Sequence, residues 1–462
     1  MKRTKYLSFC LLLFTVLYSC TGTVDESYTN AIPADATMVV SVNVKDLMAK
    51  AGYKDFQPVR TVIGSLYPAE TLSLMPDVAE AVLAEPEKSG IDFDAPVYVF
   101  RQPDGASFGI VMKVDNKEKV EAWVESTIGM PGSASVTFAH LDGNSLCVYE
   151  KNGSSVWQQP AAPEAQFKQS ASFKKMKEMK GDLRYYCDTR ELMKTYSIRA
   201  VSSLPPIYTE TGIVGTCNFD NGAASITATP VANTPEAEAA LAAFKAAFSP
   251  SEGKFIDYLP ESTTLFASIC GKGADYFDYL TNMPYMGSTF LSGHRFWKSM
   301  IGAIDGEAVI ALTDMSDYGL SFIVYADLAP EVTEAQMKEI LSRKSLHQMY
   351  WGVQDHRLYL TNDKALGENA FKKASPSLRK GEYGKQPDGK PVYMLADFAK
   401  IMSNPALKQV MAQTGDKGPL QMYALLAGME YELNGEYEMV MRIGLKDKKE
   451  NILKAVAGFL MN

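Results

Sequence analysis

Some histidine and glycine residues of this chain could bind a metal or a nucleotide, but their spacing does not favour either. The four histidines are His140, His294, His347 and His356. The sequence contains no His-Glu-x-x-His motif and no Cys-x-x-Cys pair, so it lacks a strong zinc signature. The string Gly271-Lys272-Gly273 lacks the third glycine of a dinucleotide-binding loop. We therefore expect no metal and no other cofactor.

Serine nucleophiles are equally poorly supported. The pairs Ser172/Lys175 and Ser377/Lys380 have Ser-x-x-Lys spacing, but no Ser-Asp-Asn or Lys-Thr-Gly string accompanies them. No Gly-x-Ser-x-Gly turn occurs either. The sequence therefore favours a protein without catalysis. The alternative is an envelope hydrolase whose site is assembled between two parts of the chain, because catalytic groups meet in space rather than in sequence.

Cys20 carries the clearest chemical signal. Basic residues at positions 2, 3 and 5 precede an apolar run over residues 6–18. This run is shorter than the roughly 20 residues of a membrane-spanning helix and is typical of a secretory signal. The following Leu17-Tyr18-Ser19-Cys20 resembles a bacterial lipobox, which implies a diacylglyceryl thioether on Cys20. Cys10 lies inside the apolar run and is rejected. We predict a lipoprotein signal peptide over residues 1–19 and a lipidated tether over residues 20–30.

The cysteines of the body do not form a small-domain disulfide framework. Cys187 and Cys217 both lie on expected strands, and an exported protein could pair them. Buried free thiols fit the sequence equally well. The sequence leaves this question open.

Three aromatic residues lie in polar or proline-containing loops and are candidate binding residues: Trp157, Tyr208 and Tyr383. Aromatic side chains on loops often contact protein or sugar. The alternative is that each ring folds back onto its own domain.

The elements that position these residues occur twice along the chain. Expected strands at residues 38–42 and 265–269 each follow a Pro and a Thr at the same spacing. A hairpin, an amphipathic helix and a second strand pair follow in both copies. A strand with an aspartate after it comes next, at Asp188 and at Asp397, where each carboxylate would cap a helix.

Each copy ends with a hairpin and a helix. Asn221-Gly222 and Asn434-Gly435 predict type I′ turns. Thr234-Pro235 predicts the start of the last helix of the first copy. In the second copy, Thr333 and Gln336 predict a capping box before an earlier helix.

We therefore expect an α+β fold of two tandem homologous repeats, at residues 31–250 and 251–462. Mostly antiparallel sheets should carry amphipathic helices packed on them. Together with the lipobox, the Ile-Pro-Ala-Asp-Ala-Thr opening at residues 32–37 resembles a domain-of-unknown-function family. That family comprises two-repeat cell-envelope lipoproteins of Bacteroides-type bacteria. The resemblance implies an address at the outer membrane and transfers no catalytic residue.

Composition sets the remaining limits. The chain has 462 residues, 46 basic and 54 acidic, and a formal charge of −8. This acidic balance argues against a nucleic-acid partner. We expect a non-catalytic binding or structural lipoprotein held in the membrane through Cys20, on the periplasmic face or at the cell surface. Its expected ligand is a protein or a glycan.

Overall fold

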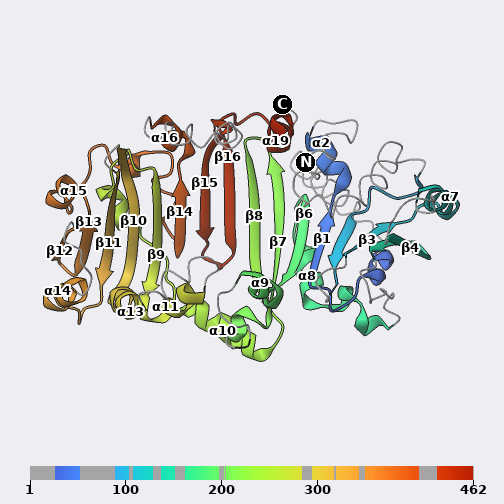
Figure 1. Ribbon diagram of the computed structural model, residues 1–462, viewed down its shortest axis with the longest axis horizontal. Coiled ribbons are helices and arrows are strands. Elements are labelled where there is room, and N and C mark those ends of the chain that lie inside the picture. The colour runs from blue at the N-terminus through green and yellow to red at the C-terminus, as the bar shows by residue number, and fades with distance from the viewer. Residues whose placement is uncertain are drawn as a thin grey trace, which may run out of the picture. The chain divides into compact units, whose positions relative to one another are not determined.

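The computed structural model describes residues 26–51, 89–102, 108–127, 137–150, 162–196, 202, 204–282, 294–316, 319–342, 349–404 and 424–460 (Figure 1). Cys20, the predicted signal peptide and Trp157 lie outside these residues. The described residues form two compact units. The first contains residues 26–36, 41–45 and the described part of 89–170. The second contains residues 37–40, 46–51 and the described residues from 171 onward.

The first unit contains a small sheet, and one α-helix packs on it within the described residues. Strand β1 (Met38–Val42) divides between the two units and α2 (Val44–Ala51) follows it. Within the unit the strand order is β1-β2-β3-β5-β4. The bounds are β2 (Val97–Arg101), β3 (Phe108–Lys113), α7 (Lys117–Thr127), β4 (Thr137–Asp142) and β5 (Ser145–Glu150). Val120 of α7 is fully buried against Met112, Leu146 and Val148 of the sheet, which holds the helix to the strands.

The second unit is built around eleven consecutive strands, shown side by side in Figure 1. Their order is β12-β13-β11-β10-β9-β14-β15-β16-β8-β7-β6, and all pairs among them are antiparallel. The strand bounds are β6 (Leu183–Asp188), β7 (Thr211–Asp220), β8 (Ala223–Ala232), β9 (Leu265–Lys272), β10 (Ile304–Ser316), β11 (Gly319–Leu328), β12 (Tyr350–Gln354), β13 (Arg357–Thr361), β14 (Val392–Ala396), β15 (Leu426–Leu433) and β16 (Met439–Leu445).

Short helices connect these strands. Their bounds are α8 (Ala171–Glu178), α9 (Thr189–Tyr196), α10 (Pro235–Ala246), α11 (Gly273–Asn282), α13 (His294–Gly302), α14 (Glu334–Ser342), α15 (Lys364–Glu368), α16 (Phe398–Ser403) and α19 (Ile452–Leu460). Single turns of 3-10 helix lie at η5 (Pro206–Tyr208), η6 (Lys254–Tyr258) and η7 (Leu378–Lys380). The α+β class and the antiparallel pairing expected from the sequence are confirmed.

Strand order reveals the duplication. The order β1-β2-β3-β5-β4 of the first unit recurs in the second unit as β9-β10-β11-β13-β12. Likewise, β6-β7-β8 and β14-β15-β16 are two copies of one arrangement. The last strands of the two copies, β8 and β16, pair with each other from Met439↔Ala228 to Gly444↔Ala223. The two repeats therefore meet through equivalent strands.

Compact units and repeats divide the chain at different places. The second unit contains all of the described second repeat and also β6, β7 and β8 of the first. The pairing of β8 with β16 accounts for this, because it places the end of the first repeat in the same sheet as the second.

The expected helix caps are present. The Thr234 hydroxyl accepts a hydrogen bond from the backbone N–H of Ala237 (3.1 Å). Gln336 accepts from the Thr333 N–H (2.7 Å), and Thr333 accepts from the Gln336 N–H (3.3 Å), which is the reciprocal capping box. Asp397 accepts from the N–H of Lys400 (3.0 Å), and Asp188 from that of Arg190 (2.7 Å).

The two predicted type I′ turns are wrong. A type I′ turn needs positive φ at both central residues, but only Gly222 of the pair Asn221-Gly222 has it. The segment after β16 binds this turn: Gly222 donates to Glu450 O (2.8 Å). The β15–β16 loop has five residues between Leu433 and Met439, with its positive φ at Tyr437. A turn with positive φ at both positions lies instead at Asp355-His356.

Candidate functional site

A single row of side chains crosses all eleven strands of the second unit's main sheet. The strand registers place one residue of each strand directly opposite the next, and opposed residues share one face of the sheet. From β12 to β6 the row is Trp351, Leu360, Val324, Ile310, Ala267, Met394, Tyr431, Met441, Ile226, Cys217 and Leu183. We call it the apolar row, and the face that carries it the open face.

None of these eleven residues is buried. Ile310 is 50% exposed, and the other ten are half-buried. Their only groups that could form hydrogen bonds are the Trp351 indole, the Tyr431 hydroxyl and the Cys217 thiol. An antiparallel sheet with one solvated face normally turns polar side chains outward. Here the outward residues are apolar, which is typical of a contact surface.

The rows on either side of the apolar row are also uncharged, and helices pack on them. On one side, α13 and α14 cover Ala308, Ala326 and Leu358, while α11 and α13 lie against Ile269. On the other side, α19 packs on a group formed by Phe219, Ala224 and Ile443. Trp351, at one end of the apolar row, also packs against the α13 and α14 cluster, and the rest of the row lies between these helix contacts. Met429, a neighbour of the row on β15, is 37% exposed.

The opposite face, which we call the covered face, carries the main core of the unit. Phe266, Val309, Tyr325 and Tyr393 from the strands are buried there beneath η6 and η7. Tyr325 donates to the carbonyl of Ala370 (2.6 Å), which ties the α15 segment down. The largest buried cluster of this part of the sheet therefore lies on the covered face, whereas the helix contacts on the open face leave the apolar row between them.

Glu432 on β15 is a buried charge on the covered face. The carboxylate is paired with Lys390 and with Arg442, whose two terminal nitrogens lie 3.0 and 3.2 Å from its oxygens. Burial alone would raise the pKa of Glu432, but the hydrogen bonds from Arg442 and Lys390 outweigh it and lower that pKa. The neighbouring Tyr393 donates to Glu430 (2.7 Å). The charges of Glu432, Lys390 and Arg442 pair with one another, which indicates a structural role for the covered face here.

A second buried carboxylate lies where the two repeats join. Glu307 is 1% exposed; one of its oxygens accepts from the Lys254 N–H (3.2 Å), and Oε1 has no hydrogen-bond partner. The neighbouring Asp327 carboxylate forms an ion pair with the Lys254 ammonium (2.6 Å) and accepts a hydrogen bond from the Glu307 N–H (2.9 Å). Burial raises the pKa of Glu307, and the Ser251 hydroxyl and Lys254 N–H oppose that shift. These carboxylates hold the joining segment in place, and we find no substrate-facing pair among them.

The two predicted loop aromatics within the described residues point back to the fold. Tyr208 is half-buried, and its hydroxyl donates to the Tyr279 carbonyl on α11 (3.4 Å). Tyr383 is half-buried against the core on the covered face. Burial raises the pKa of Tyr383 to about 12, with a smaller contribution from the charge of Glu382. The structure does not bring the two residues together.

The register separates Cys187 from Cys217. Cys217 is opposite Leu183, whereas Cys187 is opposite Ile213, four residues further along β6. At about 3.3 Å per residue this is roughly 13 Å, beyond the reach of a disulfide. Cys217 is a free thiol. Of the histidines, His140 and His356 are exposed, His294 begins α13, and His347 lies outside the described residues. Within the described ranges, no three His, Cys, Asp or Glu residues form a metal-sized group.

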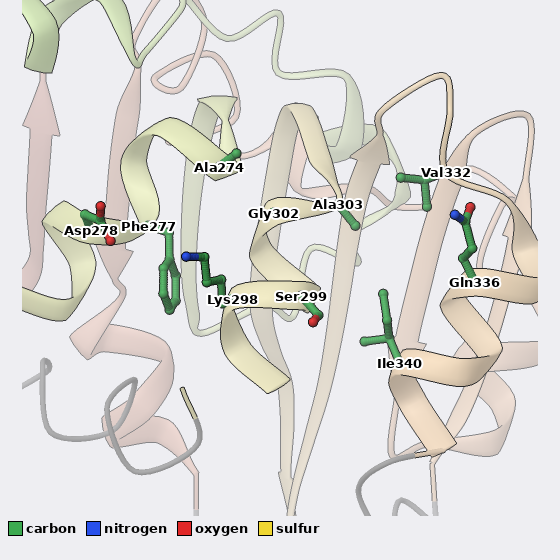
Figure 2. A pocket seen from close by; sticks show the side chains of 10 residues that line it. All are labelled: Ala274, Phe277, Asp278, Lys298, Ser299, Gly302, Ala303, Val332, Gln336 and Ile340. Atoms are coloured by element: carbon green, nitrogen blue, oxygen red, sulfur yellow. The ribbon is translucent and has the colours of Figure 1, made fainter. Parts of the chain in front are cut away.

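A cavity of ≈ 370 Å³ lies among three helices of the second unit. Figure 2 shows Phe277 and Asp278 of α11, Lys298 and Ser299 of α13, and Gln336 and Ile340 of α14 around it. Its volume is at the small end of the range for ligand sites. Asp278 and Lys298 are exposed, and Gln336 is already used in the helix cap. The cavity thus offers no buried reactive group.

Sequence reasoning missed the apolar row. Its signal is present in the alternation of β15 and β16, where Met429 and Tyr431 alternate with Glu430 and Glu432. The usual rule would turn the methionine and tyrosine inward. The structure does the reverse: Glu432 is 4% exposed, whereas Met429 is 37% exposed.

Comparison with known proteins places the chain in a family. No curated protein and no solved structure matches it. The family model described as "Domain of unknown function (DUF4836)" matches residues 28–152 and 331–453. These ranges make up more than half of the chain; the first covers the strands β1–β5, and the second covers the strands β12–β16. The chain therefore belongs to the DUF4836 family of unknown function.

Proposed function

We propose that this protein is a non-catalytic binding module, held at the outer membrane by a lipid on Cys20, whose contact surface is the open face. The observation that carries the binding role is the apolar row: eleven neighbouring strands present uncharged side chains, none of them buried. Exposing apolar side chains to water is unfavourable, and an exposed apolar surface of this kind typically marks a site that a partner covers.

The anchor rests on the lipobox-like string that ends at Cys20. Within the described residues, no helix is long and apolar enough to cross a membrane. Acyl chains on Cys20 would fix the protein to the membrane without such a helix. A Bacteroides-type envelope origin, on the periplasmic face or at the cell surface, is part of the same proposal.

The chemistry of the open face favours an apolar partner over a glycan. Sugars need hydrogen-bonding groups, and the apolar row provides three weak or isolated ones among eleven residues. Tyr208 and Tyr383 already contact their own unit. The hydrolase alternative gains no support from the carboxylates at the join, because Glu307 and Asp327 are engaged by Lys254.

Palmitate labelling in cells tests the anchor. We expect label on the wild type and on Cys10→Ala, and none on Cys20→Ala, because only Cys20 ends the lipobox. Cys10→Ala is the matched control, since it removes the other cysteine of the same N-terminal segment. Continued labelling of Cys20→Ala would overturn the anchor.

A photoreactive diazirine amino acid at position 310 tests the surface. We expect cross-links from this position in intact cells and none from position 338, an exposed site on α14 outside the apolar row. The absence of any adduct at position 310 would overturn the open face as the contact surface.

A further inference from the structure

We infer that the open face binds the acyl chains of a phospholipid. This inference rests on the proposed function and names the partner of the same surface. The first observation in its favour is the absence of charge on this face. No charged side chain occurs in the apolar row or in the two flanking rows of the eleven strands.

The number of hydrogen-bond donors and acceptors on the open face indicates whether its ligand is a hydrocarbon chain or a protein. The backbone N–H and C=O groups of central strands such as β9, β14 and β16 are used within the sheet. Protein interfaces typically form about one hydrogen bond per 100–200 Å². The centre of this face, from Ala267 to Met441, offers only the Tyr431 hydroxyl and weakly accepting methionine sulfurs for such bonds. A hydrocarbon chain needs no hydrogen bonds, so a surface with so few donors and acceptors suits this ligand.

Methionine gives the face the adaptability that fluid chains require. Met394, Met429, Met439 and Met441 all lie on the open face, on three adjacent strands. Unbranched thioether side chains adjust to irregular apolar partners. A cluster of four at the centre of the sheet therefore suits a ligand without one fixed shape.

Size favours a two-chain lipid. The apolar row spans ten strand spacings, or about 48 Å at ~4.8 Å each. The chains of one bilayer leaflet extend roughly 15 Å, half of the hydrocarbon core. The apolar row is therefore about three times as long as one acyl chain. A phospholipid can leave its head group in water.

The same features argue against simple docking onto a bilayer. Surface-bound proteins engage head groups with Lys, Arg and Trp around an apolar patch. Trp351, at the end of the row, is the one such residue among its eleven members. The chains must therefore leave the bilayer to reach the centre of the face.

The test uses the full chain carrying Cys20→Ala, so that its own lipid does not occupy the surface. It is mixed with vesicles of phosphatidylethanolamine and phosphatidylglycerol that contain pyrene-labelled phosphatidylethanolamine, then separated from them by size exclusion. We expect pyrene lipid to elute with the protein. Ile310→Lys in the same chain should reduce the lipid carried at least about tenfold, because an ammonium must be buried against hydrocarbon.

The matched control is Tyr350→Lys. Tyr350 is 42% exposed on edge strand β12 and lies on the opposite face from Trp351. We expect this variant to carry as much lipid as the parent chain. Met429→Lys provides a second variant of the open face if Ile310→Lys does not fold.

Three outcomes would overturn the inference: no lipid eluting with the protein, equal loss in Ile310→Lys and Tyr350→Lys, or protein that remains on the vesicles. The diazirine at position 310 then separates the two proposals. If it cross-links to protein in cells while no lipid is carried, the proposed binding role stands and the lipid inference fails. If it yields no adduct, both fail.

Discussion

Two buried glutamates show how opposite environments act on the same side chain. Glu432 is compensated by Lys390 and Arg442, and its pKa is lowered although burial opposes this. One oxygen of Glu307 accepts from the Lys254 N–H, Oε1 has no partner, and burial raises the pKa of this carboxyl group. The carboxylate of Glu432 therefore stabilises the fold at neutral pH, whereas the charge on Glu307 opposes folding there.

Replacing Glu307 should change the pH dependence of stability. A raised folded-state pKa means that the unfolded chain loses its proton first, so stability falls as pH rises from the ordinary glutamate range through the raised pKa. Glu307→Gln removes this loss. We expect the free energy of unfolding of the variant, relative to wild type, to increase between pH 4 and pH 8 in urea titrations. A constant difference across that range would contradict the pKa direction.

At the scale of elements, helix starts are set by short-range hydrogen bonds. Asp397 begins α16, and Thr333 with Gln336 begins α14. Each cap links residues two or three positions apart, so the sequence alone predicted it. Turns at the ends of long hairpins were less predictable. Gly222 contacts the chain near Glu450, more than 200 residues later, and that contact fixes the turn.

Removing the cap of α16 should have a moderate cost. Asp397→Ala leaves the N–H of Lys400 without its side-chain acceptor, and we expect a loss of about 1 kcal/mol in the free energy of unfolding. Urea titration at pH 7 measures it. Lys338→Ala, at an exposed position of α14, serves as control and should change stability by less than about 0.5 kcal/mol. Equal effects of the two changes would argue against the cap.

At the scale of the whole molecule, the pairing of β8 with β16 decides which pieces of the chain fold. Six residue pairs join these strands. In addition, Asn451 donates from its side chain to the Phe219 carbonyl (3.0 Å). The second repeat is thus linked to the end of the first by both backbone and side-chain contacts.

Fragments test this link. A fragment of residues 251–462 exposes the edge of β16, whereas residues 171–462 keep β8 paired with it. We expect the longer fragment to unfold cooperatively in urea. The shorter one should be less stable, since each lost cross-strand pair contributes roughly 0.2–1 kcal/mol. Sedimentation should also show it associating through the open edge. A monomeric, equally stable shorter fragment would show that the repeat folds without its partner strand.

The sequence by itself determined the α+β class, the helix caps and the duplication, and it predicts the signal that ends at Cys20. These features depend on patterns within about ten residues, or on the comparison of two such patterns. Of the candidate site, it supplied Tyr208 and Tyr383, which the structure turns toward their own unit. Trp157 and Cys20 lie outside the described residues and remain predictions.

Only the tertiary structure decided which face of the sheet is open. In β15, alternation separates Met429 and Tyr431 from Glu430 and Glu432, but alternation does not say which set faces water. That choice depends on distant residues: Lys390 and Arg442 neutralise Glu432, and η6 and η7 cover the face on which it lies. Because burial results from contacts between segments far apart in the chain, the apolar row exists only once the eleven strands are assembled in register.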